Sequence, residues 1–182
     1  MSNLPNINIF APCDNYELIK CSQTIMKSKN PTYLRLGRGD EKNIFKSKRN
    51  LNGFNEIMKG DKINVISYGP IVYEVRKALK EIKENIGCYS LPFLFQKSIE
   101  KEILRIMKKS KHLFVIEEHI SKTGLYSYIC NLKNSKNLSV KVIGLGVTYS
   151  NIYKTGTQDY LRSLNEISSD LIKKKISRLS VQ

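Results

Sequence analysis

The sequence predicts an α/β fold of three layers, in which crossover helices cover a mostly parallel sheet, preceded by a partial second α/β domain. Two observations lead to this prediction. Apolar runs of strand length alternate along most of the chain with segments whose apolar residues recur at helical spacing. That regular pattern is lost once, so residues 1–40 are expected to form the partial domain, residues 41–61 a linker and residues 62–182 the main domain.

The partial domain is expected to hold two strands and one helix. Its helix begins at a capping box, in which Asp14 accepts the backbone N–H of Glu17 and the Glu17 side chain reaches back. Its second strand ends where Gly37 and Gly39 interrupt the pattern. In chain order, the elements are a strand at Ile7–Phe10, a helix from Asp14 to about Lys27 and a strand at Thr32–Gly37.

The main domain shows the alternation most clearly. Lys62–Tyr68 is an apolar strand that ends in a tight turn at Gly69-Pro70, and the next helix, Ile71–Ile86, has one apolar face and ends at Gly87. Further strands are expected at Cys88–Leu91, His112–Glu117 and Ser139–Gly144, and further helices at Ser98–Lys109, Leu125–Leu132, Thr157–Leu164 and Ser169–Leu179.

Composition narrows the function classes. The net charge of +15 comes from basic residues spread along the whole chain, which favours a drift in composition over nucleic-acid binding. The four cysteines form no Cys-x-x-Cys pair, as is typical of reduced thiols in a cytoplasmic protein. No apolar run approaches the ~20 residues of a membrane-spanning helix, and the N-terminus lacks the features of a secretory signal.

Arg38 is the first candidate functional residue. It follows the second expected strand, at the carboxyl end where open α/β sheets bind ligands. Gly37 and Gly39 on either side let the backbone turn sharply and leave the guanidinium unobstructed. A guanidinium fixed in this way can bind a phosphate or carboxylate, whereas the alternative is an ordinary surface arginine.

A second candidate is the run Glu117-Glu118-His119 at the end of the most apolar strand. Neighbouring residues of a strand point to opposite faces, so Glu117 and His119 are expected to share one side and Glu118 to lie on the other. A carboxylate beside an imidazole can act as a general acid–base pair. The same residues can equally anchor the following loop or form an ion pair at an interface.

No complete catalytic motif accompanies these residues. Gly144-Leu145-Gly146 follows a strand, but Tyr149 stands where the dinucleotide-binding fingerprint needs glycine. The residues alone therefore predict an α/β module without a self-contained active site and without catalytic or metal-binding residues of its own.

The ordered set of segments resembles the C-terminal section of transketolases, over nearly the whole chain. The segments that carry the resemblance are Leu4-Pro5-Asn6-Ile7 with Ala11-Pro12-Cys13-Asp14, Pro31 to Gly39, Ile66-Ser67-Tyr68-Gly69, Val115-Ile116-Glu117-Glu118-His119 with Thr123-Gly124-Leu125, and Val142-Ile143-Gly144 with Gly156. The resemblance implies that residues 1–40 are the tail of a pyrimidine-binding domain and residues 62–182 a transketolase C-terminal domain. It places Arg38 at the family's substrate-phosphate position, and it gives Glu117, Glu118, His119 and Gly124 as family-motif positions to which it assigns no specific role.

The resemblance also implies a cofactor and a partner. Transketolases use thiamine diphosphate and a divalent metal to transfer a two-carbon ketol unit between sugar phosphates, and the cofactor's carbanion carries that unit. The diphosphate-binding domain and most of the pyrimidine-binding domain are missing from this sequence. We therefore expect that this chain alone binds no cofactor and is inactive, and that a partner chain supplies the missing domains in a homo- or hetero-oligomer. The alternative is that residue 1 is not the natural start of the protein.

Departures from the family pattern keep other functions open. Thr123 and Tyr126 replace glycines of the motif around Gly124, and Phe95-Gln96-Lys97 stands where the family has Pro-x-Asp. The alternatives are a related fragment, similar to a 2-oxo-acid dehydrogenase β subunit or a deoxyxylulose-phosphate synthase, and a non-catalytic assembly module. In each case the first helix and the strand before Arg38 are expected to expose apolar residues and a strand edge, the residues being Leu18, Ile25, Leu34 and Leu36.

Overall fold

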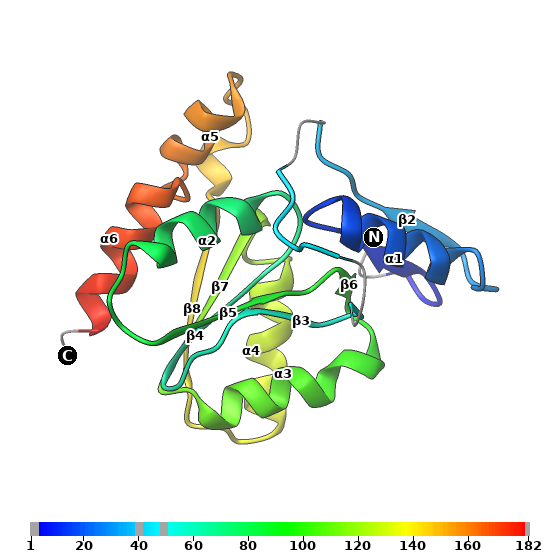
Figure 1. Ribbon diagram of the computed structural model, residues 1–182, viewed down its shortest axis with the longest axis horizontal. Coiled ribbons are helices and arrows are strands. Elements are labelled where there is room, and N and C mark those ends of the chain that lie inside the picture. Colours follow the sequence, from blue (N-terminus) through cyan, green and yellow to red (C-terminus); the bar gives the residue numbers. More distant parts are fainter. Residues whose placement is uncertain (1–3, 39–41, 48–50, 181–182) are drawn as a thin grey trace.

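The structure of the chain is a computed structural model that describes residues 4–38, 42–47 and 51–180 (Figure 1). Its strands are β1 (Asn8–Phe10), β2 (Thr32–Leu34), β3 (Asn55–Met58), β4 (Ile63–Ser67), β5 (Ile86–Ser90), β6 (Phe93–Leu94), β7 (His112–Ile120) and β8 (Lys141–Val147). Its helices are α1 (Asn15–Ile25), α2 (Ile71–Lys80), α3 (Lys97–Lys109), α4 (Leu125–Ser135), α5 (Gln158–Leu164) and α6 (Ser169–Ser180), with a short 3-10 helix η1 (Tyr149–Asn151). Within the described ranges, no helix is both long and apolar enough to span a lipid bilayer.

The larger sheet is mostly parallel. Its five strands lie in the order β3-β5-β4-β7-β8. β4 pairs in parallel with β5 and with β7, and β7 pairs in parallel with β8. β3 joins β5 in the antiparallel direction at one edge. The predicted α/β class with a mostly parallel sheet is therefore confirmed.

Helices cover both faces of this sheet, which gives the predicted three layers (Figure 1). Along β4 and β7, successive side chains point to opposite faces. Val65 and Phe114 pack into an apolar cluster with residues of α2 and α6, whereas Ile66 and Val115 pack into a second cluster with residues of α3 and α4. Both faces of the sheet are therefore removed from water, as parallel sheets require.

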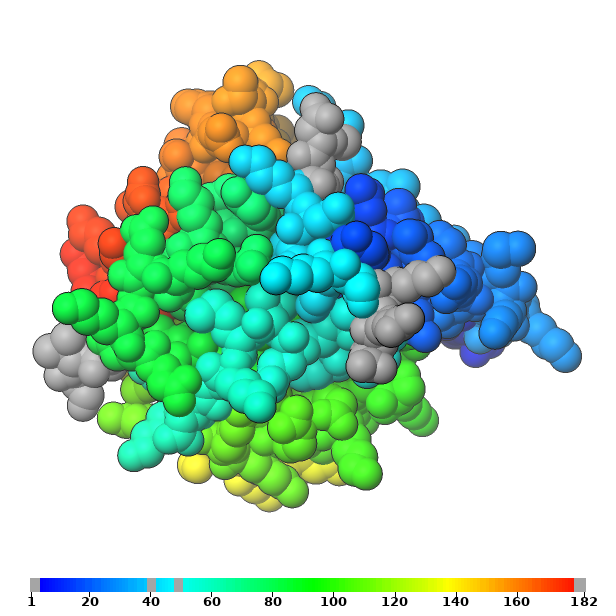
Figure 2. Space-filling view, viewed as in Figure 1, coloured from blue at the N-terminus to red at the C-terminus, as the bar shows by residue number. Residues whose placement is uncertain are grey.

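The N-terminal elements form a smaller sheet beside the larger one. Its three strands lie in the order β2-β1-β6, with β1 parallel to β2 and antiparallel to β6. Figure 2 shows this part, in blue, projecting from one side of the molecule. Ile9 and Phe10 of β1 belong to the same apolar cluster as Ile66 and Leu113 of the larger sheet. One continuous core thus joins the two sheets, and the predicted partial domain does not stand out as a separate core.

Asp14 fixes the start of α1 as the sequence predicts. Its Oδ1 accepts the backbone N–H of Glu17 at 2.9 Å. Its Oδ2 accepts the backbone N–H groups of Ile44 and Phe45, each at 2.9 Å. The carboxylate therefore caps the helix and also holds part of the 41–61 segment against it.

Glu17 ties α1 to the carboxyl end of the larger sheet. The side chain is fully buried. It reaches back as in a capping box, and there it accepts the backbone N–H of Cys13 at 2.9 Å. It also accepts hydrogen bonds from Ser90 Oγ at 3.0 Å and Asn55 Nδ2 at 2.8 Å. Burial raises the pKa of this carboxyl above its ordinary value.

Several predicted boundaries differ from the structure. The helix expected to reach Ile86 ends at Lys80, and Ile86 instead begins β5. β3 lies inside the segment predicted to be a linker, and β6 follows β5 where no strand is predicted. The helical spacing of Ile82 and Ile86 explains the first difference, because the apolar residues continue the pattern although the chain has already turned.

Of the four apolar residues expected to be exposed near the N-terminus, only some are. Leu36 is 54% exposed. Ile25 and Leu34, by contrast, are partly buried against the shared core, and Leu18 is half-buried. β2 nevertheless forms an edge of the smaller sheet, because it pairs with β1 alone among the described strands.

Candidate functional site

Arg38 lies on a cleft of about 250 Å³, which we call the Arg38 cleft. The chain after β2 forms one side, the turn before α2 and the end of β7 form the floor, and the start of α5 forms the other side. Its lining residues are Arg35, Leu36, Gly37, Arg38, Pro70, Glu118, Gly156, Gln158 and Leu161. The position agrees with the general rule that open α/β sheets bind ligands beyond the carboxyl ends of their strands.

Arg35 fixes the segment that carries Arg38. Its backbone N–H donates to the carbonyl oxygen of Phe10 at 2.8 Å, which extends the pairing of β1 and β2. Its guanidinium donates through Nη2 to the carbonyl oxygen of Glu118 at 2.9 Å. The smaller sheet is therefore tied at this point to the end of β7, and two guanidinium groups line the same cleft.

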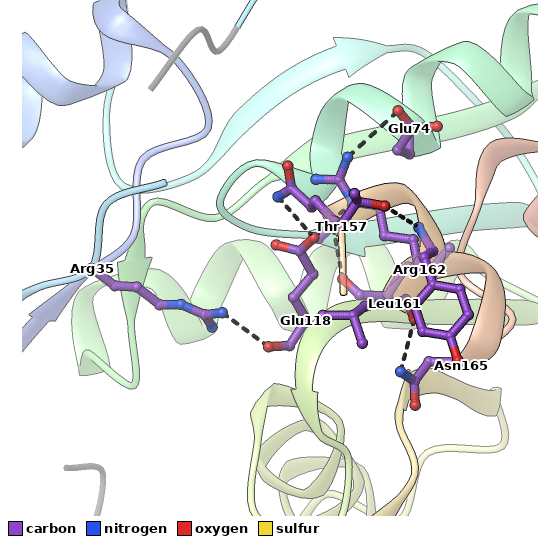
Figure 3. Close-up of polar contacts among 11 residues, drawn as sticks. Arg35, Glu74, Glu118, Thr157, Leu161, Arg162 and Asn165 are labelled. Carbon is purple, nitrogen blue, oxygen red and sulfur yellow. Dashed lines mark hydrogen bonds and ion pairs between the residues drawn. The ribbon is translucent and has the colours of Figure 1, made fainter. Parts of the chain in front are cut away.

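Glu118 stands between Arg35 and α5 (Figure 3). Its Oε1 accepts a hydrogen bond from Arg162 Nε at 2.8 Å and lies 3.5 Å from Gln158 Nε2. The Arg162 guanidinium is also 3.7 Å from Glu74 on α2. Because the side chains of Arg162, Glu118 and Glu74 are only 9%, 18% and 15% exposed, these contacts are shielded from water more than surface ion pairs are.

Glu117 serves as the cap of α4. The buried carboxylate accepts the backbone N–H groups of Leu125 at 2.9 Å and Tyr126 at 3.1 Å, and the hydroxyl of Tyr68 at 3.0 Å. Gly124 makes this approach possible, since a Cβ there would lie 2.1 Å from Glu117 Oε2. Burial raises the pKa of Glu117, and the three hydrogen bonds oppose that shift.

Glu117 and His119 are not joined by a hydrogen bond in the described part of the chain. His119 is exposed, and its Nδ1 lies 3.1 Å from the carbonyl oxygen of Ile120. Both oxygens of Glu117 are already occupied by the cap of α4. The geometry therefore favours the anchoring role of Glu117 over the acid–base role that the sequence also allows. Of the three residues in this run, Glu118 is the one that lines the Arg38 cleft.

Two residues of the site were not singled out in the sequence. Arg35 gave a weak signal, since it lies on the predicted strand three residues before Arg38. Arg162 gave none, because its partners Glu118 and Glu74 are distant in sequence and only the tertiary fold brings them together. Chemically, the cleft offers two guanidinium groups and one carboxylate that is already paired, an arrangement suited to a phosphate or carboxylate ligand.

Known proteins resemble this chain in sequence. The family model described as the transketolase C-terminal domain matches residues 54–171. A curated protein of Methanocaldococcus jannaschii, described as a transketolase C-terminal section, is 28% identical over 183 residues, which cover 97% of this chain and 56% of that protein. The 1-deoxy-D-xylulose-5-phosphate synthase of Clostridium tetani is 26% identical over 185 residues, which cover 98% of this chain and 29% of that protein.

Solved structures show the same fold. A structure described as a split-gene transketolase, in an inactive β4 tetramer, has a TM-score of 0.87 at 17% identity and covers 98% of this chain and 59% of that chain. The transketolase of Campylobacter jejuni has a TM-score of 0.65 at 14% identity, and covers 96% of this chain and 26% of that chain. This chain thus spans little more than half the length of one curated relative, 56%, and less than a third of the other, 29%. With a family model that matches well over half of its residues, the chain belongs to the transketolase C-terminal domain family.

Proposed function

We propose that the chain is the C-terminal part of a transketolase-like thiamine-diphosphate enzyme, which transfers a two-carbon ketol unit between sugar phosphates. The observation that supports this most directly is the Arg38 cleft, which Arg35 and Arg38 both line at the carboxyl end of the sheet. In this proposal, Arg38 binds the phosphate of the sugar substrate through charge-assisted hydrogen bonds.

The cofactor is assigned to another chain. Among residues 4–38, 42–47 and 51–180, no group of three or more His, Cys, Asp and Glu side chains is placed to hold a metal ion. In this proposal the diphosphate and its divalent metal are held by another chain, and the described residues of this chain take no step in the cofactor's chemistry. In the proposed complex, a partner chain carries the diphosphate-binding domain and the remainder of the pyrimidine-binding domain.

The test is reconstitution with that partner. The isolated chain is expected to show no ketol transfer, and the complex to show it. Arg38→Ala in the complex is expected to weaken the use of phosphorylated sugars by about 2–3 kcal/mol, seen mainly in KM, because a charged hydrogen bond is lost. Arg105→Ala on α3 is the matched control, since this arginine is exposed, pairs with Glu102 and does not line the cleft.

The phosphate role would be wrong if Arg38→Ala left the kinetics of phosphorylated sugars unchanged, or if it affected unphosphorylated sugars equally. Ketol transfer by the isolated chain would contradict the need for a partner.

A second candidate is supported by the relatives named as 1-deoxy-D-xylulose-5-phosphate synthases. In that case the reconstituted complex forms 1-deoxy-D-xylulose 5-phosphate, which mass spectrometry distinguishes from the products of ketol transfer. If the complex forms neither product although it assembles, the chain is better described as a non-catalytic assembly module.

A further inference from the structure

The Arg38 cleft contains a carboxylate as well as its two guanidinium groups. Glu118 lines the cleft together with Arg35 and Arg38, and it is the only acidic residue among the described lining residues. A carboxylate at this place repels an incoming anion, and a partly buried position strengthens the repulsion because little water screens it. An anion site built here therefore needs some means of offsetting the charge of Glu118.

Arg162 meets that need from outside the cleft. It comes from α5, behind the cleft wall, and it does not line the cleft itself. Its Nε is 2.8 Å from Glu118 Oε1, and the arginine side chain is only 9% exposed. Figure 3 shows Glu118 between the two arginines, with Arg35 bonded to its backbone carbonyl and Arg162 to its carboxylate.

Arg35 and Arg162 contact different atoms of Glu118, and this difference affects the charge of the cleft. The hydrogen bond from Arg35 ends on a carbonyl oxygen, so Arg35 makes no direct ion pair with the carboxylate of Glu118. Among the described residues, Arg162 is the one that forms an ion pair with this carboxylate. Glu74 lies further from Arg162, at 3.7 Å, and so competes only weakly with Glu118 for the same guanidinium.

We propose that Arg162 is a positioning residue that keeps the Arg38 cleft receptive to anions by pairing with Glu118 and holding its carboxylate toward α5. Arg162 acts through Glu118 and does not touch the ligand. The inference rests on the proposed function, because it presumes that an anion binds beside Arg38, and it adds a residue that the family motif around Arg38 does not contain.

The experiment is a charge-rescue cycle on the full chain, with inorganic phosphate as the probe. Binding is followed by NMR titration of the isotope-labelled protein at constant ionic strength, set with sodium chloride. Arg162→Met keeps the length of the side chain and removes its charge, and we expect phosphate to bind about tenfold more weakly, the effect of one uncompensated charge at a short distance. Arg162→Lys keeps the charge and is expected to stay within about threefold of the unmodified protein.

Rescue separates the electrostatic role from a structural one. Glu118→Gln alone is expected to bind phosphate at least as tightly as the unmodified protein. In the double variant Arg162→Met, Glu118→Gln, the affinity is expected to return to that of Glu118→Gln, although the ion pair that would hold α5 in place is absent. A purely structural role for Arg162 predicts no such recovery.

Each result decides the question. The inference is overturned if Arg162→Met binds phosphate normally, if the double variant stays as weak as Arg162→Met, or if Glu118→Gln weakens binding. If Arg162→Met fails to fold, phosphate binding by Glu118→Gln still tests the inference. Arg38→Ala tests the underlying site separately: if the unmodified protein binds phosphate and Arg38→Ala does not, the proposed site stands whatever the Arg162 variants show. An unmodified protein that binds no phosphate contradicts both.

Discussion

Gly124 shows how one residue without a side chain can determine the start of a helix. The space that a side chain at residue 124 would occupy is filled by the carboxylate of Glu117, which accepts the first backbone N–H groups of α4. A methyl group at this place has to displace the buried carboxyl group of Glu117 together with its three hydrogen bonds. This contact explains why residue 124 of this chain has no side chain.

Gly124→Ala is accordingly expected to lower the free energy of unfolding by about 1–3 kcal/mol, the usual cost of overpacking a tight interior site. Urea unfolding measures it. Asn131→Ala, at an exposed position of the same helix, serves as the control and is expected to change the stability by less than about 0.5 kcal/mol. An equal effect of the two substitutions would show that Glu117 and α4 tolerate a side chain at residue 124.

Glu117 also predicts a pH dependence. Its folded-state pKa lies above the ordinary value of 4.5, because burial disfavours the charged carboxylate. The stabilisation linked to this group is therefore complete below that ordinary value and is lost as the pH rises through the raised pKa. Glu117→Gln cannot titrate, so its free energy of unfolding should vary less with pH above 4.5 than that of the unmodified protein. Parallel pH profiles of the two proteins would contradict this.

At the scale of the element, α1 depends on a single carboxylate for two connections. Asp14 caps the helix and also binds the backbone at Ile44 and Phe45. Asp14→Ala is expected to cost about 2 kcal/mol, the upper end for loss of an N-cap, since two further N–H donors lose their acceptor. Hydrogen exchange should become faster at the amides of residues 17, 44 and 45 together. Asn15→Ala, one residue later and exposed, is the control that should leave all three unchanged.

The sequence predicts elements well where one local pattern decides them. The strands of the parallel sheet are rich in apolar residues, and Asp14 with Glu17 marks a helix start, so these elements are found close to their predicted places. β3 was missed because Asn55 to Met58 shows no alternation and pairs only at an edge. β6 has two residues, and its pairing with β1 is a tertiary contact between distant parts of the chain.

The same distinction holds within the candidate site. Arg38 could be found because glycines flank it and because the chain around it resembles a known family. The pairing of Arg162 with Glu118 could not be predicted. The sequence around each residue gives no sign that the two side chains meet in the fold. Glu117 was found, but its role as a cap depends on the approach of α4, which only the three-dimensional structure shows.

At the scale of the whole molecule, the shared core predicts a single unfolding transition. Phe10 is fully buried in the cluster that also holds Ile66 and Leu113. Phe10→Ala is expected to cost about 3–5 kcal/mol, as large-to-small changes in a core do. Hydrogen exchange should show protection falling by the same free energy in β1 and in β4. Two separate transitions, with β4 unaffected, would instead show that the smaller sheet unfolds independently.

The pairing of β6 with β1 has a consequence for how such chains can be divided during evolution. β6 lies beyond β5 in the chain and completes the N-terminal sheet by pairing with β1. A break in the gene near residues 41–61 would therefore put β1 and β6 in different products, and each product would have an unpaired strand edge. A break upstream of β1, by contrast, leaves β1, β2 and β6 together in one product. The segment in which the periodic pattern is lost is therefore not a place where this fold divides into two complete sheets.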